Sequence, residues 1–107
     1  MRKASNKKAK IIYVDIDNTI CITNGMDYKN SVPMPRRIEN INDLYKKGHR
    51  IIYWTARGVG RGIDLHKMTL KQLKGWGCLF DKLIIDKPVY DLFIDDKNIN
   101  SEMYFND

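Results

Sequence analysis

The stretch that decides the fold is an apolar run ending in two carboxylates, Tyr13-Val14-Asp15-Ile16-Asp17-Asn18-Thr19. Its β-branched residues predict a buried strand from Lys10 to Ile16. Ligands of parallel α/β sheets bind at the carboxyl ends of the strands. Asp15 and Asp17 would project from one side of an extended strand and repel each other unless a cation or a shared proton lies between them. The stretch therefore predicts a site suited to Mg²⁺, with turn or helix-capping aspartates as the alternative.

The positive charge of the chain is concentrated at its beginning. The 107 residues allow one small domain, and the net charge is +6. The first ten positions contain no acid and hold the following basic residues: Arg2, Lys3, Lys7, Lys8 and Lys10. The rest of the chain is almost neutral, so the net charge alone does not predict a nucleic-acid-binding surface. We expect residues 1–9 to form a disordered basic tail, or an arm that contacts nucleic acid, and residues 10–107 to form the domain.

The sequence argues against several classes of protein. The apolar run before Asp15 is too short for a secretory signal, and no run is long enough to span a membrane. Cys21 and Cys78 lack the spacing of a zinc site or a disulfide scaffold. No partner lies at ligand spacing from His49 or His66, so neither is expected to be catalytic. We therefore expect a cytoplasmic protein with two free thiols and no membrane partner.

Strands and helices alternate along the predicted domain. After the first strand the sequence predicts a loop or small hairpin over 19–32, a helix that begins near Pro35 and ends before Gly48, and a second strand over 50–54. A second helix follows, capped by Asp64 and ended by Gly75 and Gly77. The remaining predicted elements are strands over 82–85 and 92–94 and a last helix or docked tail over 99–105. This order predicts an α/β fold, a three-layer α/β sandwich with a small, mostly parallel, Rossmann-like sheet and right-handed crossovers.

Every predicted strand ends in polar residues that can do chemistry. Asp15 and Asp17 follow the first strand, Thr55 follows the second, Asp86-Lys87-Pro88 follows the third, and Asp95-Asp96 follows the fourth. In a parallel sheet these ends lie at one edge. The sequence therefore predicts one site that combines at least four carboxylates with a hydroxyl and an ammonium group.

In these motifs the chain resembles the haloacid dehalogenase superfamily of phosphohydrolases. Asp15-Ile16-Asp17-Asn18-Thr19 is similar to the first motif, and Thr55, Lys87 and Asp95-Asp96 are similar to the other three. Asn18 replaces the usual glycine, which is a minor departure because asparagine tolerates unusual backbone angles. The segments over 54–58 and 94–97 resemble very small members associated with capsular polysaccharide synthesis or with phage genomes. The short intervals between the motifs imply a domain without a cap.

The residue types and the resemblance imply the same catalytic roles. Asp15 is expected to attack phosphorus and form an aspartyl-phosphate, and Asp17 to act as general acid and then as general base. Thr55 is expected to bind the phosphoryl group, and Lys87 to orient Asp15 and offset the negative charge. Mg²⁺ is the expected cofactor. Its implied ligands are Asp15, Asp17 through its backbone carbonyl, and Asp96 together with Asp95.

The expected substrate-binding residues follow the first two strands: Asn18, Thr19, Ala56, Arg57 and Arg61. Backbone N–H groups near Asn18 would bind phosphoryl oxygens. Arg57 and Arg61 would hold a second anionic or hydroxyl-rich group, with a solvated loop as the alternative. Tyr28 and Lys29 are similar candidates.

The predicted function is Mg²⁺-dependent hydrolysis of a phosphomonoester, with a sugar phosphate as the favoured substrate. A nucleic-acid 3′-phosphatase aided by the basic tail is the weaker alternative. A non-catalytic phospho-binding protein is the third, although the intact motif residues argue against it. A site without a cap is open to a large substrate or to a neighbouring subunit, so a homo-oligomer stays an open alternative, as does transfer to an acceptor other than water.

Overall fold

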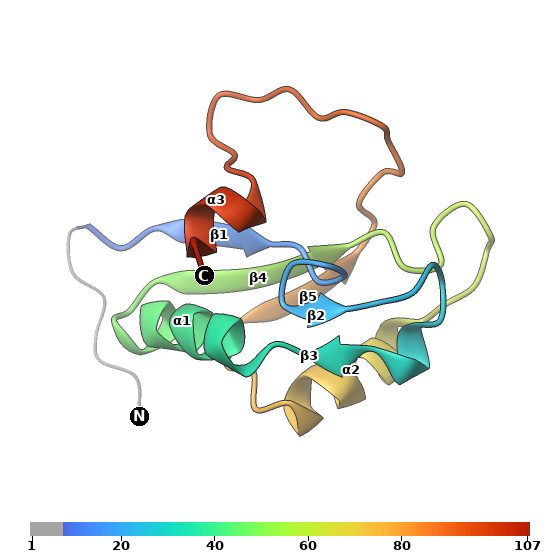
Figure 1. The fold of residues 1–107 in the computed structure, drawn as a ribbon, viewed down its shortest axis with the longest axis horizontal. Helices are drawn as coiled ribbons and strands as arrows, with labels where there is room; N and C mark the ends of the chain where they lie inside the picture. Colours follow the sequence, from blue (N-terminus) through green and yellow to red (C-terminus); the bar gives the residue numbers. More distant parts are fainter. Residues whose placement is uncertain (1–7) are drawn as a thin grey trace.

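A three-stranded parallel sheet lies at the centre of the computed structural model, which describes residues 8–107 (Figure 1). The strands are β1 (Ile11–Val14), β4 (Arg50–Thr55) and β5 (Lys82–Ile85), in the order β1-β4-β5. In the register, Val14 lies beside Tyr53, and Tyr53 lies beside Leu83. The predicted α/β fold with a small parallel sheet and no cap is confirmed. The predicted basic tail falls largely on residues 1–7, outside the described residues.

Helices and a small hairpin connect these strands. The hairpin pairs β2 (Cys21–Ile22) with β3 (Val32–Pro33) and contains the 3-10 helix η1 (Tyr28–Asn30), and the helices are α1 (Pro35–Lys46), α2 (His66–Gly75) and α3 (Ser101–Phe105). Pro35 begins α1, where its missing N–H costs no helical hydrogen bond. Gly48 follows α1 with a φ of 100°, a conformation that glycine adopts without strain. The sequence therefore marks both ends of this helix, the beginning with Pro35 and the end with Gly48.

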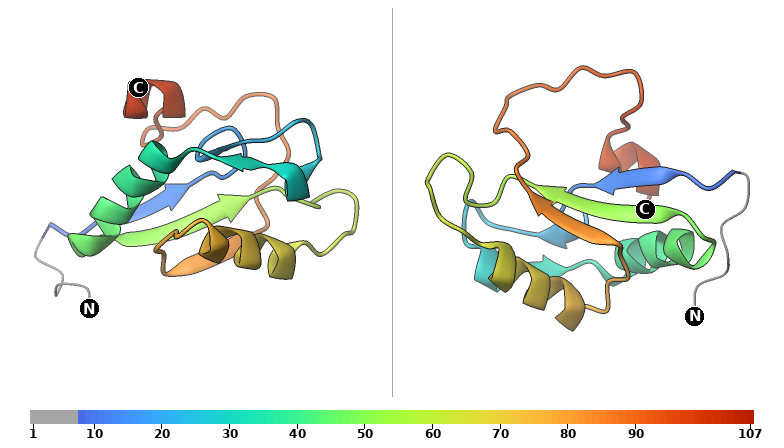
Figure 2. Two further views of the ribbon diagram at one scale, coloured as in Figure 1. Left: turned by 60° about the horizontal axis from the view of Figure 1, so that its bottom comes forward. Right: turned by 180° about the vertical axis from the view of Figure 1, so that it is seen from behind.

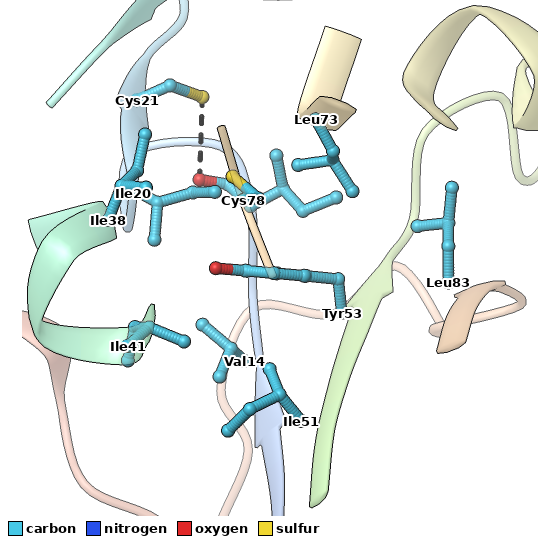
Figure 3. Packing of buried hydrophobic residues seen from close by; sticks show 11 residues of the cluster. Val14, Ile20, Cys21, Ile38, Ile41, Ile51, Tyr53, Leu73, Cys78 and Leu83 are labelled. Atoms are coloured by element: carbon cyan, nitrogen blue, oxygen red, sulfur yellow. Dashed lines mark hydrogen bonds between the residues drawn. The ribbon is translucent and has the colours of Figure 1, made fainter. Parts of the chain in front are cut away.

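Both long helices pack against the same face of the sheet (Figures 2 and 3). Because β1, β4 and β5 succeed each other in one direction, right-handed crossovers place α1 and α2 on one side. The α/β sandwich is as predicted, but among residues 8–107 the long helices cover one face of the sheet and not the two faces of the expected three-layer arrangement. The buried cluster draws on both helices and all three strands: Val14, Ile38, Ile41, Ile51, Tyr53, Leu73 and Leu83. This core holds the carboxyl ends of the strands in place, which is the edge where the candidate site lies.

The predicted fourth strand over 92–94 is wrong. Residues 86–100 leave the sheet as an extended segment without regular structure (Figures 1 and 2). Leu92 is 75% exposed and Ile94 is 86% exposed, so neither is part of a core. Three apolar residues between Asp91 and Asp95 offer few backbone hydrogen bonds, and a strand this short needs a neighbour to hold it. The structure therefore contains three of the four predicted parallel strands within residues 8–107.

The buried arginine of α1 holds the C-terminal segment. Arg37 forms ion pairs with Glu102 and with Asp107, the latter at 2.9 Å, and its guanidinium lies 4.7 Å from the centre of the Phe105 ring. The Arg37 hydrogen bond lowers the pKa of the Asp107 carboxyl. Arg37 Nη1 also donates to the Thr19 carbonyl at 3.1 Å. The C-terminal helix is thereby connected to the turn that follows β1.

Both cysteines are free, as predicted, and the structure shows that both are also buried. Burial raises the pKa of the Cys78 thiol to about 11 and also raises that of Cys21. At pH 8 the thiolate fraction of Cys78 is therefore about one in a thousand, and the thiolate is the reactive form. We expect the native protein to react with a disulfide reagent far more slowly than the denatured protein. Rapid labelling of either thiol in the native protein would contradict this burial.

Candidate functional site at the carboxyl edge of the sheet

The turn after β1 folds around an asparagine in the left-handed region. Asn18 has a φ of 59°, which asparagine tolerates better than most residues. The Asn18 N–H donates to the Cys21 carbonyl at 2.8 Å, and the Thr19 N–H donates to the Ile16 carbonyl at 3.1 Å. These two amides close the turn. The expectation that backbone N–H groups near Asn18 bind phosphoryl oxygens is therefore corrected for Asn18 and Thr19.

The Asp15 carboxylate lies between a cation and a hydroxyl group. Lys87, from the segment directly after β5, places its Nζ 3.4 Å from Asp15 Oδ1. Thr19 Oγ1 donates to Asp15 Oδ2 at 3.1 Å. The Asp15 side chain is 37% exposed, whereas that of Lys87 is only 14% exposed. This carboxylate is held in orientation by two partners and is still open to solvent, as an attacking group must be.

Asp17 has a different partner, the buried guanidinium of Arg57. Arg57 Nη2 lies 2.8 Å from Asp17 Oδ1, and Arg57 Nε donates to Asp17 Oδ2 at 3.0 Å. Thr23 Oγ1 donates to the same carboxylate at 2.6 Å. The Arg57 side chain has no exposed surface. The predicted role of Arg57 in substrate binding is therefore corrected, because its buried guanidinium orients Asp17.

The remaining donors of Arg57 bind residues that the sequence analysis did not single out. Arg57 Nη1 donates to Gln72 Oε1 at 2.6 Å and to Thr69 Oγ1 at 3.2 Å, both on α2. Gln72 in turn donates to the Tyr28 carbonyl at 2.8 Å, and the Tyr28 ring lies 4.9 Å from the guanidinium carbon. The sequence feature that could have indicated these partners is Thr69, a polar residue at a position of α2 that faces the core. The predicted candidate Tyr28 therefore contacts Arg57.

The ends of β4 and β5 meet at the same edge. The Lys87 N–H donates to the Thr55 carbonyl at 3.2 Å, and Thr55 Oγ1 accepts a hydrogen bond from the Arg57 N–H at 3.2 Å. Thr55 is buried, and the adjacent Ala56 is half-buried. The structure thus brings Asp15, Thr55 and Lys87 together from three strand ends, as the sequence predicted.

The loop over residues 57–62 carries the second candidate arginine. Gly58 has a φ of 78°, and a Cβ there would lie 2.2 Å from the Ile63 carbonyl oxygen, so this position requires glycine. Arg61 is exposed on the same loop. The sequence left two interpretations of Arg61, substrate binding or a solvated loop, and its exposure agrees with the second. A substrate-binding role for Arg61 stays a prediction.

The predicted magnesium ligands are not gathered in one place. Asp95 and Asp96 lie in the exposed segment over 86–100, where the Lys97 N–H donates to Asp95 Oδ2 at 3.1 Å. Residues 8–107 contain no group of three His, Cys, Asp or Glu side chains that could hold a metal ion. The charges of Asp15 and Asp17 are instead offset by Lys87 and Arg57. This arrangement therefore does not fit a Mg²⁺ ion held by the predicted carboxylates.

Comparison with known proteins supports the fold. No family model matches the chain, and no curated protein matches it. A crystal structure of a structural genomics target from Vibrio cholerae is similar, with 25% sequence identity and a TM-score of 0.78 over 90% of this chain and 86% of that chain. Among residues 8–107, none of the helices has the length and hydropathy of a membrane-spanning helix. The chain is thus a small α/β domain with a charged site at the carboxyl edge of its sheet.

Proposed function

We propose that this protein is a phosphomonoester hydrolase that forms an aspartyl-phosphate on Asp15. The proposal is supported by one arrangement above all, the solvent-open Asp15 carboxylate with Lys87 Nζ at 3.4 Å. It is also supported by the resemblance of the motifs to the haloacid dehalogenase superfamily. A carboxylate that is oriented by a cation beside it and is still accessible can attack an electrophile that carries negative oxygens. From the sequence, a sugar phosphate is the favoured substrate class and a nucleic-acid 3′-phosphate is the alternative, and the cytoplasm is the proposed location.

In the proposed first step an Asp15 oxygen forms a bond to phosphorus while the bond to the leaving oxygen breaks. Lys87 offsets the charge on the phosphoryl oxygens, and Asp17 gives a proton to the leaving oxygen. In the second step water attacks the phosphoryl group, its proton passes to Asp17, and Asp15 is released. The contacts with Arg57 and Thr23 hold the Asp17 side chain in one orientation beside Asp15, as both steps require.

We also propose that the reaction requires Mg²⁺, on the basis of the motif resemblance and not of the arrangement of the carboxylates. If Asp96 binds the ion, Asp96→Asn should raise the Mg²⁺ concentration needed for half-maximal phosphate release by about tenfold or more. The matched control is Asp91→Asn, which removes a charge from the same exposed segment and should leave this concentration unchanged. An unchanged requirement in Asp96→Asn would remove Asp96 from the proposed metal site.

Phosphate release from a panel of sugar phosphates, nucleotides and phosphorylated oligonucleotides tests the proposed activity. We expect release by the wild-type protein in the presence of Mg²⁺ and none by Asp15→Asn. The same release by both proteins would identify a contaminating phosphatase and contradict the proposal. Tight binding of a phosphorylated ligand without any release would instead favour the non-catalytic alternative.

A further inference from the structure

Aromatic rings gather on the face of the sheet opposite to α1 and α2. Side chains alternate along a strand, so Tyr13 and Trp54 point away from the core that holds Val14 and Tyr53. The Tyr13 and Trp54 rings meet edge to face, with their centres 5.5 Å apart. Tyr13 is 54% exposed, although a large aromatic side chain gains from burial. This face therefore presents an accessible aromatic surface.

Lys87 connects these rings to the candidate nucleophile. Its Nζ lies 5.6 Å from the centre of the Trp54 ring and 5.4 Å from the centre of the Tyr90 ring. The Tyr90 ring contacts that of Phe93 edge to face at 5.5 Å. The same Nζ lies 3.4 Å from Asp15. The Lys87 ammonium group thus lies between the accessible Asp15 carboxylate and the rings of Trp54 and Tyr90. The Tyr90 side chain is 45% exposed.

The charge of this face suits a polyanion. The strand positions that alternate with the core are Ile11 and Tyr13 on β1, Arg50, Ile52 and Trp54 on β4, and Lys82 and Ile84 on β5. These positions include two cations and no acid. The acid beside them is Asp86, directly after β5, which accepts a hydrogen bond from Trp54 Nε1 at 2.6 Å. Arg50 and Lys82 lie at the beginning of their strands, whereas Trp54 lies near the end that carries the site. A chain of phosphates could therefore follow this face from Asp15 toward the basic end of the strands.

We propose that the aromatic surface of Tyr13, Trp54 and Tyr90 binds the bases of a single-stranded nucleic acid whose terminal phosphate lies at Lys87 and Asp15. Bases stack on exposed aromatic rings, and cations beside the rings bind the phosphates. A sugar phosphate has no planar ring and only one charged group. It would therefore contact Lys87 and leave the aromatic rings without a binding partner. This inference rests on the proposed function for the identity of the phosphate site and replaces the sugar phosphate with a nucleic-acid end as the substrate class.

Binding measured without turnover tests this inference separately from the proposed activity. The protein is the full chain with Asp15→Asn, and the probe is a short fluorescein-labelled oligothymidylate with or without a 3′-phosphate, followed by fluorescence anisotropy at low salt. Removal of a stacking ring in Tyr13→Ala or Tyr90→Ala should weaken binding between about fivefold and a hundredfold. The matched control is Tyr104→Ala on α3, where the tyrosine is 40% exposed and its hydroxyl donates to Asn40.

We expect the oligonucleotide with the terminal phosphate to bind more tightly than the one without it, and Tyr104→Ala to bind within twofold of its parent. Equal affinity in all the tyrosine variants would overturn the stacking surface. Binding of a mononucleotide as tightly as the oligonucleotide would overturn the nucleic-acid strand in favour of a nucleotide metabolite. If binding behaves as expected and the wild-type protein releases no phosphate from any substrate, the inference holds and the proposed activity fails.

Discussion

Asp15→Asn should reduce phosphate release by at least about a thousandfold, because the amide oxygen is a poor nucleophile toward phosphorus. The substitution preserves the size of the side chain and an acceptor for the Thr19 hydroxyl group. It removes a partly exposed ion pair with Lys87, and such pairs contribute about 1 kcal/mol or less. The variant should therefore fold and unfold almost as the wild-type protein does, and steady-state phosphate release at saturating substrate measures the effect.

Thermal unfolding followed by circular dichroism is the control for this prediction. A melting temperature close to that of the wild type assigns the lost activity to the chemistry and not to the fold. Lys87→Met offers a second comparison, because it removes the cation and retains a long apolar side chain beside Trp54. A folded Asp15→Asn protein that retains wild-type turnover would mean that another group is the nucleophile.

Arg57→Gln should lower both the stability and the activity of the protein. The substitution leaves Asp17 without its cation, and it also removes the donors to Thr69 and Gln72. Loss of one partner from a buried ion pair costs about 3–5 kcal/mol, because the other charge stays partly buried and unpaired. For a domain of this size the melting temperature should fall by about 10 °C or more. Differential scanning calorimetry measures the change.

The matched control for Arg57→Gln is Arg61→Gln, which removes the same charge from an exposed position of the same loop. Surface substitutions of this kind change stability by about 0.5 kcal/mol or less. Arg57→Lys should recover only part of the stability, because an ammonium group cannot bind Asp17 and α2 together as the guanidinium does. Equal melting temperatures for the Arg57 and Arg61 variants would contradict the buried ion pair.

Three strand ends could be placed from the sequence because each follows an apolar β-branched run with a clear period. The runs before Asp15, Thr55 and Lys87 each pack one face of a strand against the helices, so local pattern and tertiary packing agree. The first of them differs from the expected buried strand over Lys10 to Ile16, because β1 covers only Ile11–Val14, and its Ile11 and Tyr13 are exposed. The helix that begins at Pro35 was equally predictable, because Pro35 and Gly48 mark its two ends. Where local signals and packing coincide, the sequence is sufficient.

The fourth strand and the role of Arg57 could not be predicted for two different reasons. Leu92 and Ile94 have the composition of a strand, but a strand exists only when a neighbour pairs with it, and pairing is a property of the whole fold. Arg57 follows Thr55 in a glycine-rich loop, which is typical of an exposed substrate-binding group. Its burial depends on Thr69 and Gln72, whose contact with the loop is not readable from sequence spacing.

The central claim is that Asp15 takes the phosphoryl group, and an acid-quench experiment tests it most directly. The wild-type protein is mixed with a substrate labelled in its phosphoryl group, quenched in acid during turnover, and digested, and the label is located by mass spectrometry. The account predicts a phosphorylated peptide that carries Asp15 in the wild type and no labelled peptide in Asp15→Asn. Release of phosphate by a wild-type protein that never carries the label, or carries it on another residue, would contradict it.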